Sequence, residues 1–262
     1  MKILVTVTEV AEADDEFEID GTSIQDRYLA YDLNEWDDYA VEEAVQIGEA
    51  HDDVEVVTVT VGPERAEETI RQTLAKGADR AVRIWDDSLA EESLLDPATK
   101  AELLASVAEE EDPDFIFSGV QSGDVAYAAT GVSLAEALDF QWAAVVNDFD
   151  LDVDAGQAHV NRELEGGLIE LTDVELPAVF TIQTGINEPR YASLRGIRQA
   201  QSKPLDVKTT DDLGVDVAGS SLSLSALYEP ETESDVTYFE GSAEETAAEL
   251  AAFLKDEKGV GA

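Results

Sequence analysis

Cysteine is absent from this chain of 262 residues, and basic residues are scarce, with 16 Lys and Arg against 60 Asp and Glu. Without thiols the chain forms no disulfide, no thiolate nucleophile and no sulfur-ligated metal site. Histidine occurs only at His51 and His159, and neither has metal-ligand spacing to a second strong ligand. The scarcity of basic residues argues against nucleic-acid binding, because phosphate contact needs a basic surface.

Long apolar runs are also missing. No stretch approaches the ~20 apolar residues of a membrane-spanning helix, so we expect no membrane insertion. The first ten residues, MKILVTVTEV, lack the basic segment and cleavage site of a signal peptide, and we expect a cytoplasmic location. Neither a GxxxxGK(S/T) loop nor a GxGxxG turn after the first strand is present, which argues against a P-loop ATPase and the usual dinucleotide fingerprint.

The net charge of −44 is extreme, and the acids are spread along the whole chain between periodic segments. A disordered acidic tail would instead concentrate them in one block. In concentrated salt the Debye length falls to ~3 Å, and self-repulsion is screened. We therefore expect a halophilic protein from a cytoplasm of high salt concentration.

Strand and helix patterns alternate at regular spacing, which predicts an α/β fold with a doubly wound, mostly parallel sheet. Expected strands cover 3–10, 54–61, 81–85, 114–119, 143–149 and 178–182. Expected helices cover 37–50, 97–110, 125–138 and 243–255, with a further helix between Gly62-Pro63 and Gly77. We expect residues 11–34 to be an irregular excursion. Gly166-Gly167 between two alternating runs predicts a β-hairpin.

Three motifs in order carry a resemblance to a known family: RELEGGLIE from Arg162, LPAV from Leu176 and NEPRYASL from Asn187. They are supported by GADR at 77–80, GPE at 62–64 and DLGVD at 212–216. Together they resemble the β subunit of electron transfer flavoproteins over nearly the whole chain. The resemblance implies a Rossmann-like sheet of the adenine-nucleotide-binding type and an electron carrier without bond-making chemistry of its own.

A stretch of small residues, 119–131, follows the expected strand at 114–119 and could let a backbone approach a ligand closely. Free amides at a helix start and the hydroxyls of Ser122 and Thr130 could receive a phosphate. From residue types alone the ligand signal is weak, and a small-residue helix packed against the sheet is the favoured interpretation of this stretch.

The resemblance implies that this stretch holds AMP, or a second FAD in its place. The positions that match the family's nucleotide site are Thr6, Asn34, Gly62, Gly119, Gln121, Asp124, Ala128, Ala129, Thr130 and Gly131. The family has an acidic run and Asn-Gln before its threonine, whereas this chain has Val125, Ala126, Ala128 and Ala129. Backbone amides would therefore replace side-chain contacts to the phosphate.

The resemblance further implies that a partner α subunit holds most of the redox FAD, with Trp36 forming part of one wall. The family's basic pair after the first strand falls at Thr8 and Glu9, so that feature is lost. Donor acyl-CoA dehydrogenases would dock on an irregular loop, with Leu194 as the anchor and Glu163 near a domain hinge. A membrane quinone oxidoreductase would receive the electrons. The positions implied in docking are Glu163, Asn187, Glu188, Pro189, Arg190, Tyr191, Leu194 and Arg195.

Two alternatives stay open. In the loop at 187–196, the arginines could pair with nearby acids and Leu194 could be buried in its own core. The whole chain could instead be a stand-alone adenine-nucleotide-binding protein resembling universal-stress domains. We expect an α/β domain over residues 1–204 and a C-terminal arm over 205–262, which has too little apolar surface for its own core and would lie on the α subunit.

Overall fold

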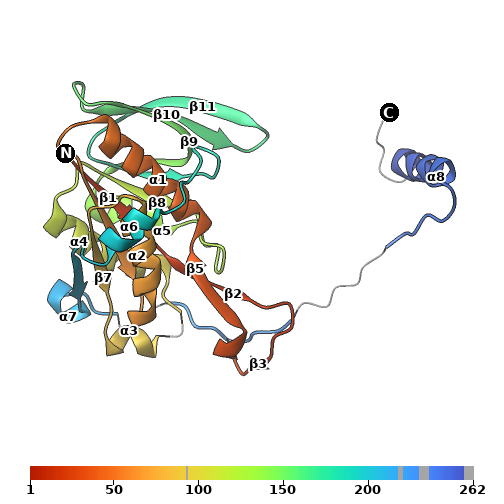
Figure 1. The fold of residues 1–262 in the computed structure, drawn as a ribbon, viewed down its shortest axis with the longest axis horizontal. Helices are drawn as coiled ribbons and strands as arrows, with labels where there is room; N and C mark the ends of the chain where they lie inside the picture. The colour runs from red at the N-terminus through yellow and green to blue at the C-terminus, as the bar shows by residue number, and fades with distance from the viewer. Residues whose placement is uncertain (93, 218–220, 230–235, 257–262) are drawn as a thin grey trace. The chain divides into compact units, whose positions relative to one another are not determined.

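One large sheet organises the chain, as the computed structural model shows (Figure 1). Its nine strands lie in the order β11-β10-β9-β12-β8-β1-β6-β7-β13. All neighbours are parallel except β10, which runs antiparallel to β9 and β11. The strands are β1 (Lys2–Thr6), β6 (Glu55–Val61), β7 (Arg80–Ile84), β8 (Phe115–Gly119), β9 (Gln141–Asp152), β10 (Gln157–Leu164), β11 (Leu168–Glu175), β12 (Ala178–Ile182) and β13 (Leu205–Lys208).

The structure describes residues 1–92, 94–217, 221–229 and 236–256, in two units. The first, Met1–Leu227, contains the sheet. The second, Tyr228–Ala262, contains α8 (Ala243–Asp256), where the ring of Phe253 packs 5.9 Å from that of Phe239. Because β13 belongs to the sheet, the structure places the boundary later than the expected one after residue 204.

Helices cover both faces of the sheet and produce two apolar cores. On one face lie α1 (Glu35–Ala50), α2 (Glu67–Lys76) and the end of α6 (Leu194–Ala200). On the other lie α3 (Asp87–Glu91), α4 (Pro97–Glu111), α5 (Thr130–Leu138) and the end of α7 (Thr210–Leu213). The expectation of a doubly wound α/β fold is confirmed, since crossovers on both sides of a parallel sheet define that architecture.

An aromatic cluster ties the hairpin end of the sheet to its centre. Phe115, Phe117, Phe149 and Phe180 come from β8, β9 and β12, and their ring centroids lie 5.0 to 6.2 Å apart. The expected hairpin is present: β10 and β11 pair up to Leu164 opposite Leu168. Gly166 and Gly167 in the turn have φ angles of 78° and 75°, which favour glycine.

Four local expectations were wrong. The first strand ends at Thr6, and residues 9–13 form β2 (Glu9–Ala13), which pairs with β5 (Leu29–Leu33). The excursion at 11–34 is thus partly ordered, with a second ribbon of β3 (Ile19–Asp20) and β4 (Ser23–Ile24) and a 3-10 turn at Asp26–Tyr28. The helix expected from residue 125 begins only at Thr130, and α6 begins inside the expected loop, at Leu194. The 3-10 turn Glu64–Ala66 precedes α2.

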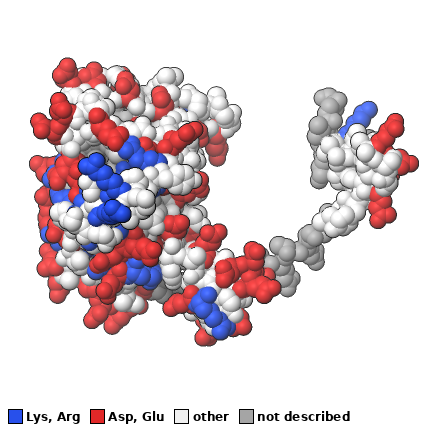
Figure 2. Space-filling view, in the orientation of Figure 1, with Lys and Arg blue, Asp and Glu red and all other residues white. Residues whose placement is uncertain are grey.

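The surface of the first unit is dominated by acids. Figure 2 shows Asp and Glu spread over the visible face, with the largest area of Lys and Arg lying beside the position of α6 in Figure 1. Arg195 and Arg198 of α6 are both exposed. The acids are not gathered into a tail, so the charge belongs to the folded surface.

Candidate functional site

A pocket opens where β1, β6 and β8 end. The chain passes from β1 to β6 on one side and returns to β8 on the other, and ligands of doubly wound sheets bind at such a switch point. The pocket contains about 640 Å³ of unfilled space, open solvent included. Its lining is Thr6, Val7, Thr8, Asn34, Asp37, Val59, Val61, Leu95, Pro97, Lys100, Leu104, Ser118, Gly119, Val120, Gln121, Ser122, Val125, Tyr127, Ala128, Ala129 and Thr130. We call it the strand-end pocket.

Asn34, at the start of α1, fixes the loop that follows β8. Its Nδ2 donates to the carbonyl of Gln121 at 2.9 Å, and its Oδ1 accepts from the amide of Gly123 at 3.2 Å. The side chain is 1% exposed. With both ends of its amide engaged, Asn34 holds the shape of the pocket wall.

Asp37, one turn further, joins the ends of two strands. Its Oδ2 accepts from the amide of Thr8 at 2.8 Å and its Oδ1 from the amide of Gly119 at 2.9 Å. Burial, the largest effect, raises the pKa of Asp37 to about 6, although these hydrogen bonds and one from Asn34 oppose the shift. A Cβ at Gly119 would lie 2.5 Å from Oδ1 of Asp37, so only glycine fits there.

The loop after Gly119 has an unusual backbone. Ala126 and Ala128 have φ angles of 49° and 52°, in the left-handed region that L-residues rarely adopt. Ala129 is the N-cap of α5 and makes no side-chain cap hydrogen bond. The first amides of α5 therefore lack a side-chain acceptor at a pocket wall, where such amides can bind an anion. Strained backbone of this kind clusters at ligand sites.

A separate hydrogen-bonded chain runs from α1 to the hairpin. The indole nitrogen of Trp36 donates to Oε1 of Gln183 at 3.0 Å. Gln183 in turn donates to Glu163 at 3.3 Å, and Glu163 accepts from Asn147 at 2.8 Å. Trp36 is not part of the pocket lining, so this chain marks a second polar region beside the end of β12.

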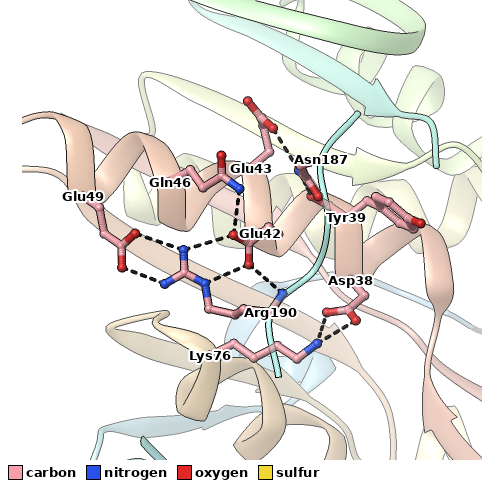
Figure 3. A network of polar contacts seen from close by, with 9 residues as sticks. All are labelled: Asp38, Tyr39, Glu42, Glu43, Gln46, Glu49, Lys76, Asn187 and Arg190. Carbon is pink, nitrogen blue, oxygen red and sulfur yellow. Dashed lines mark hydrogen bonds and ion pairs between the residues drawn. The ribbon is translucent and has the colours of Figure 1, made fainter. Parts of the chain in front are cut away.

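The segment before α6 is held against α1 by a dense network (Figure 3). The guanidinium of Arg190 donates to Glu42 at 2.8 and 3.0 Å and to Glu49 at 2.6 and 2.9 Å. Asn187 donates to the carbonyl of Tyr39 at 3.1 Å and to Glu43 at 2.9 Å. The side chain of Glu42 is only 4% exposed, and hydrogen bonds from Arg190 and Gln46 outweigh its burial and lower its pKa.

The helix α6 is fixed in turn to α2. A Cβ at Gly196 would lie 2.2 Å from the carbonyl oxygen of Ala75, so the two helices approach closely. Arg71 of α2 donates to the carbonyls of Ala200 at 2.6 Å and Lys203 at 2.9 Å. Tyr191 and Leu194 point away from this support and are 98% and 78% exposed. An aliphatic and an aromatic side chain are thus presented to solvent from a rigid base.

Comparison with known proteins agrees with the motifs. The electron transfer flavoprotein domain family matches residues 22–213. The β subunit of an electron transfer flavoprotein from Methylophilus methylotrophus is 46% identical, with 99% of this chain and 100% of the relative covered. The chain belongs to the electron transfer flavoprotein β-subunit family. The mitochondrial β subunit of Arabidopsis thaliana is 37% identical, with 90% of this chain and 92% of the relative covered. The β subunit of Mus musculus is 37% identical, with 87% of this chain and 86% of the relative covered.

Membership of this family brings several properties. Proteins of the electron transfer flavoprotein family carry electrons, bind FAD and AMP, and pair a β subunit with an α subunit. The lining of the strand-end pocket suits an adenine nucleotide in kind, since small residues and an uncapped helix start allow close approach to a phosphate.

Most residues expected at the nucleotide do line the strand-end pocket: Thr6, Asn34, Gly119, Gln121, Ala128, Ala129 and Thr130. Three others lie just outside it. Gly62 donates to the carbonyl of Ile84 at 3.1 Å, and Asp124 accepts from the amide of Val125 at 2.7 Å. Gly131 lets α5 approach the sheet, because a Cβ there would lie 2.6 Å from Cγ2 of Thr181.

The residues expected to dock partners divide into two groups. Asn187 and Arg190 are engaged with α1, Pro189 is half-buried, and Glu188, Tyr191, Leu194 and Arg195 are exposed. Glu163 is exposed on β10, where it accepts hydrogen bonds from Asn147 and Gln183. Of the alternative interpretation of the loop at 187–196, one part is observed, the pairing of Arg190 with acids, and the other, the burial of Leu194, is not.

Sequence reasoning missed the two charged residues of the pocket lining, Asp37 and Lys100. Asp37 stands three positions after Asn34, the spacing at which an acid supports a helix start, and this signal could have identified it. Lys100 lies within α4 and has no local signal; only the fold brings it to the pocket.

Within the described residues, no group of three or more His, Asp or Glu could hold a metal ion. Over the same residues, no helix combines the length and apolar character needed to cross a membrane.

Proposed function

We propose that this chain is the β subunit of a heterodimeric electron transfer flavoprotein that takes electrons from acyl-CoA and other dehydrogenases and passes them to a membrane quinone oxidoreductase. The electrons travel through FAD, and the chain makes and breaks no bonds of its own. The observation that carries this proposal is Leu194, 78% exposed on a helix that α2 holds rigidly. Leu194 is exposed on the same segment as Tyr191, and exposed apolar patches mark protein-contact sites.

The cofactors divide between two regions of the chain. FAD is held mainly by the α subunit, and the region of Trp36, Gln183 and Glu163 supplies one wall. This assignment is supported by the fixed indole of Trp36, which hydrogen bonds orient outside the strand-end pocket. AMP occupies the strand-end pocket; a second FAD is the larger alternative. The uncapped start of α5 in the pocket wall, where helix amides can receive a phosphate, supports an adenine nucleotide there.

The C-terminal unit packs on the α subunit. Several of its large apolar side chains are exposed within the chain itself, as expected of a surface that a partner covers: Tyr228 at 77%, Tyr238 at 82%, Leu250 at 44% and Leu254 at 38%. We also infer that the protein is cytoplasmic and of a haloarchaeal type, the latter from its extreme acidity. Cell fractionation tests the location, and the dependence of the melting temperature on salt tests the halophilic character.

The test is electron transfer by the heterodimer. The full chain, purified with its α subunit, should contain FAD and form a semiquinone on stepwise reduction. Substituting Leu194→Ala should slow reduction by an acyl-CoA dehydrogenase about 10-fold or more, the effect of losing a hot-spot side chain. FAD content and thermal stability should stay unchanged, because Leu194 packs against nothing that holds the fold.

Leu171→Ala is the matched control, since Leu171 of β11 is 80% exposed but far along the chain from α6. Equal rates for Leu194→Ala and wild type would remove Leu194 from docking. A colourless protein that turns over ATP alone would instead favour the stand-alone nucleotide-binding alternative.

A further inference from the structure

Lys100 is the only basic residue among the described residues that line the strand-end pocket. It projects from the first turn of α4; Leu95, just before this helix, and Leu104, further along it, also line the pocket. In a chain with 16 basic residues and 60 acidic ones, a lysine partly buried in a pocket needs a physical reason. Burying an ammonium group is costly unless a counter-charge or hydrogen-bond acceptor compensates.

The protein itself supplies little compensation. None of the ion pairs of 4.0 Å or shorter between described residues involves Lys100. The nearby charges of Asp124 and Asp37 favour the ammonium, but burial is the larger effect and lowers the pKa of Lys100. Asp37 is already engaged by the amides of Thr8 and Gly119. The ammonium therefore has unused capacity to bind an anion.

A second feature of the same pocket favours an anion. The uncapped start of α5, with Ala128 in the left-handed region and Ala129 as N-cap, lines it together with Lys100. The helices α4 and α5 pack against each other on one face of the sheet. Amides at a helix start and a lysine ammonium are the two kinds of donor that protein sites use for phosphate.

The loop itself provides no cationic side chain. Between Gly119 and Thr130 the chain has no Lys, Arg or His, and Asp124 adds a negative charge. With a net charge of −44 for the whole chain, an anionic ligand would also meet general repulsion. A cation supplied by another element, Lys100 of α4, offsets both the charge of Asp124 and this general repulsion.

We propose that Lys100 binds the phosphate of the adenine nucleotide in the strand-end pocket and so selects AMP over the uncharged nucleoside. This inference rests on the proposed function, in which that pocket holds AMP. The adenine and ribose bind against the rest of the pocket lining and do not depend on Lys100.

The experiment compares a charged ligand with its uncharged analogue. The heterodimer is freed of bound nucleotide, and the dissociation constants of AMP and adenosine are measured by calorimetry at fixed salt. Lys100→Met should weaken AMP about 10- to 100-fold, the effect of losing a charge-assisted hydrogen bond. Adenosine should change less than about 3-fold, because no phosphate contact is lost.

Lys208→Met is the control, since it removes the same charge from β13, where Lys208 pairs with Glu110 at the surface. It should leave the dissociation constants of both ligands unchanged. If Lys100→Met does not fold, as judged by FAD content and melting temperature, Lys100→Gln supports the same comparison without the charge.

Equal weakening of AMP and adenosine would overturn the phosphate role and make Lys100 a residue that shapes the pocket. Unchanged AMP binding would overturn it as well. A wild-type heterodimer that binds neither ligand would refute the proposed nucleotide itself, and that failure is distinguishable because it is seen before any substitution.

Discussion

At the scale of single residues, the strand-end pocket depends on Asp37. From the first turn of α1, the carboxylate accepts hydrogen bonds from the amides of Thr8 and Gly119, at two different strand ends. It is 3% exposed. A short polar side chain thus joins α1 to β1 and β8, and the pocket wall is fixed before any ligand binds.

The buried carboxylate predicts a specific pH dependence. Because the pKa of Asp37 is raised to about 6 in the folded chain from an ordinary value of 3.8, its charge reduces stability above pH 6. For a shift of this size the loss of folding stability is up to about 3 kcal/mol, and it disappears as the pH falls toward 4. Asp37→Asn cannot titrate, so the stability of wild type relative to Asp37→Asn should rise between pH 7 and pH 4. Denaturant unfolding at constant salt measures it, and a constant difference would contradict the prediction.

At the scale of elements, α1 connects the two regions that the proposed function uses. Asn34 and Asp37, at the start of α1, line the strand-end pocket. Glu42 and Glu49, further along the helix, accept hydrogen bonds from Arg190. The segment before α6 is therefore pinned to the same helix that shapes the pocket. The rigid presentation of Tyr191 and Leu194 follows from this anchoring, and less conformational entropy is lost when a partner binds.

Removing the anchor should loosen that segment. Arg190→Gln leaves Glu42, whose side chain is 4% exposed, with Gln46 but no cation, and we expect a loss of about 2 kcal/mol or more. Hydrogen exchange should increase in residues 187–193 and stay unchanged in the core strands. Arg195→Gln is the control, because Arg195 is exposed on α6. Equal exchange in the two variants would mean that the ion pairs do not hold the segment.

Elements with a strong local pattern could be predicted from sequence, and the others could not. The run at 178–182 is a buried β-branched and aromatic strand with no competing signal, and its bounds were correct. The alanines at 126–129 favour helix by propensity, yet Ala126 and Ala128 adopt left-handed φ angles that the surrounding fold imposes. The ribbon of β2 and β5 was missed because its acidic residues lack the alternation of a half-buried strand.

The site shows the same division. Thr6, Gly119 and Thr130 were found because a family resemblance marked their positions, and they line the pocket. Lys100 was missed because the sequence of α4 contains no motif that marks this lysine as a ligand-binding residue. Its importance comes from a contact between elements distant in the chain, which no local pattern contains.

At the scale of the whole molecule, the net charge of −44 sets the conditions under which the fold is stable. Only 16 basic residues are available to pair with 60 acids, so most carboxylates have no cation of their own, and Figure 2 shows acids spread over the visible face of the first unit. Their repulsion acts against the folded state, in which the acids are closest together. Salt weakens this repulsion as the Debye length falls from ~10 Å at 0.1 M to ~3 Å at 1 M.

The melting temperature should therefore rise by roughly 10 °C or more between 0.1 M and 2 M KCl, if screening removes several kcal/mol of repulsion. Scanning calorimetry of the heterodimer across that range measures the change. Sulfate separates screening from the general exclusion of salt from protein surfaces, which strengthens apolar burial in any protein. At matched ionic strength, screening predicts similar stabilisation by chloride and sulfate, whereas exclusion predicts a much larger effect of sulfate. A melting temperature that does not depend on KCl would show that the acidic surface is tolerated in dilute buffer, and the expectation of a halophilic protein would be wrong.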